Sequence, residues 1–151
     1  MSEKRHDGIA AAVDFSPSSE AAARYAADLA RARKASLFLI HVLEVLPPII
    51  PGTETFFVAD LKRAIANDRR REKVQLAGLI RRLRPGRLKV SAVWREGHPA
   101  TEIVKAAEEL GAEAIVMGTR RRSDLQKAVL GSVATEVVRH ARCPVLTVRE
   151  S

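Results

Sequence analysis

The feature that most constrains this chain is the alternation of short apolar runs with longer segments of helical periodicity. Apolar runs of strand length cover residues 8–15, 36–43, 88–94, 114–117 and 144–148. Between them, apolar residues recur at helical spacing over residues 17–34, 58–84, 100–110 and 131–141. Short continuous runs are typical of strands that are buried on both faces, and strands that alternate with helices indicate βαβ units. The pattern therefore predicts an α/β fold with a parallel sheet.

Right-handed crossovers and helices that cover both faces leave few topologies for such a sheet. In residues 88–94, apolar side chains occupy alternate positions, which is typical of a strand near a sheet edge. We predict a flavodoxin-like, Rossmann-like open sheet of five parallel strands in the order 3-2-1-4-5. Residues 45–57 contain three prolines and a glycine and are predicted to form a loop. A chain of 151 residues that is 46% hydrophobic is expected to form a single domain, residues 1–151.

The predicted order reverses its winding between the first and fourth strands, so a crevice is expected at their carboxyl ends. Asp14 and Gly118 end those two strands. The Asp14 carboxylate is suited to accept hydrogen bonds from a ribose or a base, although it could instead cap the first helix. Gly131 and Ser132 open the last helix, where free backbone N–H groups favour an anion. A Gly-Ser pair is also an ordinary way to begin a helix.

Several short motifs occur in this order along nearly the whole chain. They are Val13–Ser16, Gly97–Ala100, Val116–Thr119, Leu130–Val133 and Cys143–Leu146. Together they resemble the universal stress protein family. The resemblance implies a stress-linked sensor or regulator rather than a fast enzyme, and a homodimer that forms through the C-terminal strand.

Members of that family that bind ATP carry a glycine, two residues, a second glycine, nine residues and then Gly-Ser or Gly-Thr. Gly118, Gly131 and Ser132 match this spacing, whereas Arg121 replaces the second glycine. The resemblance implies that the base and ribose are bordered by Ala12, Val13, Asp14, Val42 and Met117. It implies that the phosphates are faced by Gly118, Gly131, Ser132 and Val133.

Arg121 has two possible consequences for a phosphate site. A residue with a Cβ costs about 1 to 2 kcal/mol where the backbone requires a positive φ. Conversely, Arg120 and Arg121 would place guanidinium groups beside the phosphates, and such groups form charge-assisted bonds to them. The arginines therefore either compensate for lost backbone donors or block the site. Ala134 also departs from the family, because some members that bind ATP carry a hydroxyl there.

The net charge of +8 favours anionic partners. ATP or another adenine nucleotide is the partner that the motifs favour, and the need for magnesium is left open. The alternative is a dimeric interaction module that binds no nucleotide. Its edge strand, Val145–Val148, would pair with its own copy. Nucleic acid is a weaker hypothesis, because the arginine runs of the second helix suit a solvated face and only 4% of residues are aromatic.

Other chemistry finds little support in the sequence. Neither a P-loop motif nor a dinucleotide-binding GxGxxG motif is present. The four histidines show no metal-binding spacing, and Cys143 is the only cysteine, which suits an inert buried thiol. We therefore predict no catalytic residue and no metal site, while slow ATP hydrolysis stays open. No apolar run approaches the ~18 residues of a membrane span, so a cytoplasmic protein is expected.

Overall fold

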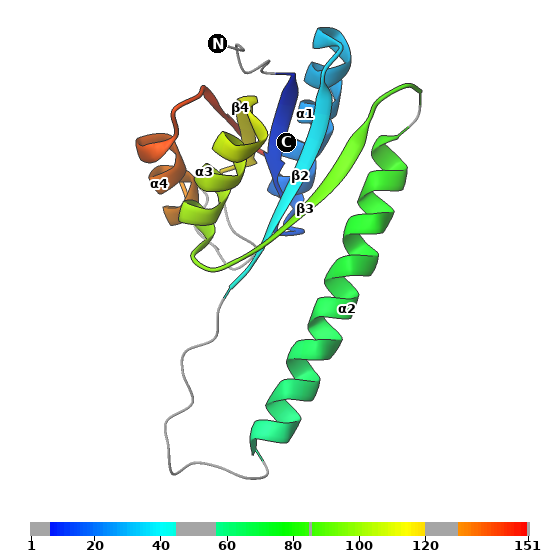
Figure 1. The fold of residues 1–151 in the computed structure, drawn as a ribbon, viewed down its shortest axis with the longest axis vertical. Helices are drawn as coiled ribbons and strands as arrows, with labels where there is room; N and C mark the ends of the chain where they lie inside the picture. The colour runs from blue at the N-terminus through cyan, green and yellow to red at the C-terminus, as the bar shows by residue number, and fades with distance from the viewer. Residues whose placement is uncertain (1–6, 45–56, 85, 120–129, 151) are drawn as a thin grey trace.

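The computed structural model describes residues 7–44, 57–84, 86–119 and 130–150, with only the backbone of residues 57–59. Its elements follow one another as β1 Gly8–Ala12, α1 Pro17–Arg33, β2 Ser36–Leu43, α2 Phe57–Leu83, β3 Val90–Glu96, α3 Pro99–Leu110, β4 Ala112–Gly118, α4 Ser132–His140 and β5 Val145–Val148. All strand pairs are parallel, and the order is β3-β2-β1-β4-β5. The predicted fold and strand order are confirmed (Figure 1).

Strand β1 lies at the centre of the sheet and is buried along its whole length. Ala11 pairs with Leu39 of β2 on one side and with Val116 of β4 on the other. Because successive side chains point to opposite faces, Ile9 and Ala11 join the core under α1 and α2, whereas Ala10 joins the core under α3 and α4. One strand thus serves both layers of helices.

Helix α1 packs on the sheet through a face made of small residues. The buried residues of this helix are Ser18, Ser19, Ala22, Ala23, Ala26, Ala27 and Ala30. The helix begins at Ser16, whose hydroxyl accepts a hydrogen bond from the Ser19 N–H group, and Pro17 occupies its first turn. It ends at Lys34 in the left-handed conformation. Small side chains allow the helix axis to approach the strands closely.

Helix α2 is anchored by only part of its length. Leu76, Leu79 and Leu83 are buried in the core that α1 shares with the sheet. The N-terminal half of the helix extends well past the carboxyl ends of the strands (Figure 1). Phe57 belongs to this helix rather than to the predicted loop, and the other residues of that loop lie outside the described part of the chain.

The boundaries of several elements differ from the predicted ones by two or three residues. The first strand ends at Ala12 rather than at residue 15, and Phe15 has a φ of 63°. A left-handed residue cannot continue a strand, so the chain turns there although its side chain is apolar. Strand β3 runs two residues later than predicted because its ladder with β2 begins at Val90 and continues to Glu96.

The small-residue face of α1 leads to a prediction about packing. Replacing Ala26, which is fully buried, with leucine should lower the free energy of unfolding by about 1–3 kcal/mol, because the added atoms have no space. The control is Ala32→Leu on the exposed face of the same helix. This substitution should change the free energy of unfolding by less than about 0.5 kcal/mol. Urea denaturation followed by circular dichroism measures both. Equal stability of the two variants would contradict close packing of α1.

Candidate functional site

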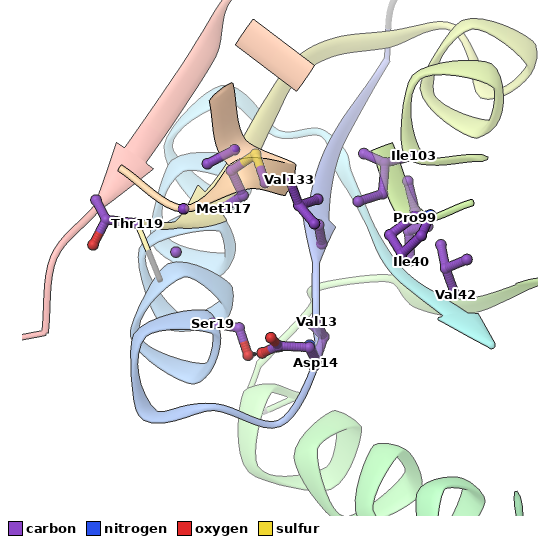
Figure 2. Close-up of a pocket in the computed structure, with 14 residues that line it drawn as sticks. Val13, Asp14, Ser19, Ile40, Val42, Pro99, Ile103, Met117, Thr119 and Val133 are labelled. Atoms are coloured by element: carbon purple, nitrogen blue, oxygen red, sulfur yellow. Dashed lines mark hydrogen bonds between the residues drawn. The ribbon is translucent and has the colours of Figure 1, made fainter. Parts of the chain in front are cut away.

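A pocket opens between the carboxyl ends of β1 and β4, where the order of the sheet reverses. The space inside it is about 80 Å³ when only the enclosed part is counted and about 560 Å³ when the open mouth is included. Apolar side chains from β2, β4 and α3 line its inner part, among them Ile40, Met117 and Ile103 (Figure 2). Asp14 and Ser19 lie together at another side of it (Figure 2). The pocket therefore offers an apolar recess beside polar groups.

Most of the residues predicted from the sequence line this one pocket. They are Ala12, Val13, Asp14, Val42, Met117, Gly118, Gly131 and Val133. Ser132 is exposed at the start of α4 and does not line the pocket itself. Arg120 and Arg121 lie outside the described residues, so their predicted role stays a prediction.

Several residues of the pocket lining were not predicted from the sequence. They are Ser19, Ile40, Pro99, Ile103 and Thr119, while Ala134 had been noted only as a departure from the family. A signal for Ile40 was present, because it lies two residues before Val42 on the same strand and therefore faces the same side. Pro99 belongs to one of the quoted motifs. Ile103 follows one helical turn later on α3.

The Asp14 carboxylate is held in place by the start of α1. Its Oδ1 atom accepts hydrogen bonds from the backbone N–H and the hydroxyl of Ser16, the first at 3.0 Å. The Asp14 N–H group donates to the Ser19 hydroxyl at 3.2 Å. Ser16 rather than Asp14 caps the helix, so the alternative capping role of Asp14 is wrong. Among the described residues, none donates a hydrogen bond to Oδ2, which leaves that oxygen available to a ligand.

His41 of β2 is a buried histidine that holds the chain at the carboxyl end of β1, next to Asp14. The His41 ring is 5% exposed, and its Nδ1 atom lies 2.7 Å from the Val13 carbonyl oxygen. Because a carbonyl oxygen only accepts, Nδ1 carries the proton. The ring also packs against Phe15 and Trp94, with centroid distances of 4.8 and 5.2 Å. Since the Val13 N–H group donates to the Ile40 carbonyl at 2.9 Å, both backbone groups of Val13 are occupied within the protein.

Gly118 is required by the packing of the protein itself. A Cβ atom at this position would lie 2.5 Å from the Ser18 hydroxyl oxygen and 2.8 Å from the Ser19 backbone nitrogen. Real Cβ atoms do not approach backbone so closely, and the end of β4 therefore passes the first turn of α1 only as glycine. This contact lies beside the Asp14 loop. Gly118 thus has a structural role in addition to the ligand contact predicted from the sequence.

The ends of the segment between β4 and α4 are joined by a hydrogen bond. The Gly131 N–H group donates to the Thr119 carbonyl at 2.6 Å, and the Thr119 N–H group donates to the Val148 carbonyl at 3.1 Å. Gly131 has a φ of −58°, which other residues also adopt. The N–H groups of Ser132 and Val133 lie in the first turn of α4, where a helix provides no backbone acceptor. In the part of the chain that the structure describes, no group accepts a hydrogen bond from either of them.

Comparison with known proteins decides the family. A family model described as the universal stress protein family matches residues 7–149. The chain belongs to the universal stress protein family. A universal stress protein of Thermus aquaticus is 36% identical over 143 residues, which cover 93% of this chain and 97% of that protein.

Solved structures of universal stress proteins share the fold of this one. The universal stress protein UspA from Lactobacillus plantarum has a TM-score of 0.84 at 21% identity, over 97% of this chain and all of that chain. The universal stress protein from Archaeoglobus fulgidus in complex with dAMP has a TM-score of 0.60 at 26% identity, over 93% of this chain and 96% of that chain. The likeness to UspA shows only a shared fold. The Archaeoglobus fulgidus protein was solved with an adenine nucleotide, dAMP.

The remaining chemistry of this universal stress protein is modest. Among the described residues, no group of His, Cys, Asp and Glu side chains is arranged to hold a metal ion. Cys143 is half-buried beside the core under α3 and α4, and burial raises the pKa of its thiol above the ordinary value. A raised pKa leaves less of the reactive thiolate near neutral pH. No helix in the described ranges combines the length and apolar composition needed to span a bilayer.

Two glycines of this universal stress protein are predicted to respond in opposite directions to the same substitution. Gly118→Ala should lower the free energy of unfolding by about 1–3 kcal/mol, because the added methyl group meets the backbone of α1. Gly78→Ala in α2 should raise it by about 0.5–1 kcal/mol, because no atom lies within 4 Å of the new methyl group and alanine favours the helix. Chemical denaturation measures both variants. Loss of stability in Gly78→Ala alone would refute this account.

Proposed function

We propose that this universal stress protein binds ATP or a related adenine nucleotide in the pocket between β1 and β4. It acts as a nucleotide-dependent sensor in the stress response rather than as a fast enzyme. One observation carries the proposal: the pocket joins an apolar recess, the Asp14 carboxylate and the beginning of α4. These three features suit the base, the ribose and the phosphates of one ligand.

Each part of a nucleotide has a chemically suitable partner. The base fits between apolar side chains such as Val42 and Met117. A ribose hydroxyl donates to the Oδ2 oxygen of Asp14, whose other oxygen is already bonded to Ser16. The phosphates lie at the N–H groups of Ser132 and Val133, where the helix dipole also favours negative charge. The dAMP complex of the Archaeoglobus fulgidus relative supports an adenine nucleotide as the ligand class.

The two arginines of the neighbouring segment are part of this proposal. Arg120 and Arg121 follow Thr119, whose carbonyl accepts the hydrogen bond of Gly131. We place their guanidinium groups beside the phosphates, where they replace the backbone donors of the missing glycine. The competing hypothesis is that Arg121 closes the phosphate end, and that the protein then acts through its dimer alone.

Calorimetric titration of ATP, with and without magnesium, tests nucleotide binding. Wild-type protein should bind with a micromolar Kd. Asp14→Ala should weaken binding about tenfold or more, because a hydrogen bond to a charged group contributes about 1.5–3 kcal/mol and each 1.4 kcal/mol is tenfold. Gly131→Arg should abolish binding by filling the phosphate end. Asp28→Ala, which removes an exposed carboxylate on the far part of α1, is the matched control and should leave Kd unchanged.

The variant Arg121→Gly separates the two roles of the arginine. It should weaken ATP binding if the guanidinium group contacts a phosphate. Binding by Arg121→Gly but not by the wild type would show that the site is closed in this chain. It would favour the dimeric module that binds no nucleotide.

We also propose that the protein is a homodimer whose β5 strands pair with each other. Strand β5 lies at the edge of the sheet. The carbonyl groups of Pro144 and Val148 accept bonds from Ile115 and Thr119, so these alternate positions face β4. Val145 and Thr147 therefore present their backbone groups to the outside of the sheet. An exposed row of donors and acceptors at a two-fold axis suits pairing with a second copy.

A proline at residue 147 tests this dimer. Thr147→Pro removes an outward N–H donor and leaves the ladder to β4 intact, so sedimentation should shift from dimer to monomer. Thr147→Val keeps the donor and should remain dimeric. A wild-type protein that sediments as a monomer, or an unchanged dimer in Thr147→Pro, would overturn this interface.

A further inference from the structure

The outer side of α2 carries a one-sided row of cations, which we name the α2 stripe. Its members are Lys62, Arg63, Arg70, Lys73 and Arg81, and Arg84 follows directly after the helix. At 3.6 residues per turn, the five members fall within about a third of the helix circumference and extend over about 28 Å. Ala66 and Ala77 lie between them on the same side. No acidic residue of α2 occurs within this row.

The cations of the α2 stripe are exposed and have no anionic partner in the protein. All of them are exposed, and within the described ranges none forms an ion pair. In contrast, Arg69 lies 3.3 Å from Glu96, and Arg82 lies 3.6 Å from Glu20. Among the described residues, the arginine runs of the helix therefore contain paired members, the unpaired members of the stripe and Arg71, which is unpaired on another side of the helix. Sequence alone could not make this division.

Acidic residues gather on another side of the same helix. Asp68 and Glu72 line a groove between α2 and the carboxyl ends of β2 and β3, together with Glu44 and Glu96. The buried apolar residues of α2, Leu76, Leu79 and Leu83, lie in its C-terminal part and pack against the sheet. Because no acidic residue of α2 lies within the stripe, positive potential is concentrated along it. The N-terminal half of α2 projects beyond the strands, so a large partner reaches it without obstruction from the sheet (Figure 1).

We propose that the α2 stripe binds the phosphate backbone of double-stranded nucleic acid without sequence preference. A duplex carries one negative charge per ~1.7 Å of its axis, so a segment as long as the stripe, about 28 Å, carries roughly 17 phosphates, and the stripe faces those on one side of it. No base-reading side chains are required, because phosphate contacts alone supply such binding. This surface lies on a different element from the nucleotide pocket and does not depend on nucleotide binding.

The chemistry of the stripe favours a duplex over other polyanions. Single strands are bound mainly through aromatic side chains that stack on bases, and the stripe has none. A membrane-surface helix inserts an apolar face beside its cations, but the buried apolar residues of α2, Leu76, Leu79 and Leu83, are already packed against the core. A protein interface requires apolar anchors at its centre, whereas alanines separate these cations.

The test uses the full chain and a fluorescent 30-base-pair duplex of mixed sequence, with anisotropy measured from 50 to 200 mM salt. The triple variant R63Q/R70Q/K73Q should bind at least tenfold more weakly at 50 mM salt. Its slope of log K against log salt should fall by about 2–3, because each lost phosphate contact removes about 0.9. The control R24Q/K105Q/R139Q loses the same charge on other helices and should change the affinity by less than about twofold. Circular dichroism confirms that both variants are folded.

Three outcomes of this experiment would contradict the proposal that the α2 stripe binds a duplex. Absence of duplex binding by the wild type at 50 mM salt would overturn it. Equal weakening of the two triple variants would show a response to net charge rather than to the α2 stripe. Tighter binding to vesicles of anionic lipid than to the duplex, lost in the same variant, would assign the stripe to a membrane instead. ATP affinity should be unchanged in R63Q/R70Q/K73Q, so this test is independent of the nucleotide site.

Discussion

The close approach between the end of β4 and the first turn of α1 is the constraint on which the site depends. Gly118 has no side chain, and the backbone of Ser18 and Ser19 occupies the space that a Cβ would take. This contact brings the start of α1 against the crevice, and Ser16 and Ser19 then hold the Asp14 carboxylate and N–H group. The pocket wall is therefore built by packing before any ligand is present.

His41 secures the same loop from β2. Its ring contributes a hydrogen bond to Val13 and fills the space between Phe15 and Trp94, while Nε2 lies 3.4 Å from the Glu72 carboxylate. Neither Nε2 nor this Glu72 oxygen forms a hydrogen bond with a described residue, so α2 lies beside the ring without being bonded to it. A pocket held from both sides needs little reorganisation on binding, which lowers the entropic cost of association.

The periodicity of apolar residues was sufficient to predict the strand order, because buried parallel strands and right-handed crossovers leave few alternatives. Local detail was harder to predict. Phe15 is apolar and was predicted to belong to the first strand, yet β1 ends at Ala12 and the positive φ of Phe15 turns the chain beyond it. Asp14 and Ser16 both suit a helix cap, and only geometry shows that Ser16 has this role. Ser19 reaches the pocket through tertiary packing, which no spacing encodes. The glycine spacing of the family predicted that Gly118 belongs to the site. The contact with α1 that requires a glycine at this position is visible only in the structure.

The hydrogen bond between Gly131 and Thr119 has a consequence for how this protein can diversify. It closes the chain across residues 120–129 with backbone atoms alone, next to β4 and α4. The entropic cost of lengthening a closed loop grows only slowly with its length, about 0.6 kcal/mol per doubling. The segment between these two anchors can therefore change in length during evolution with little cost in the free energy of folding, while β4 and α4 keep their places.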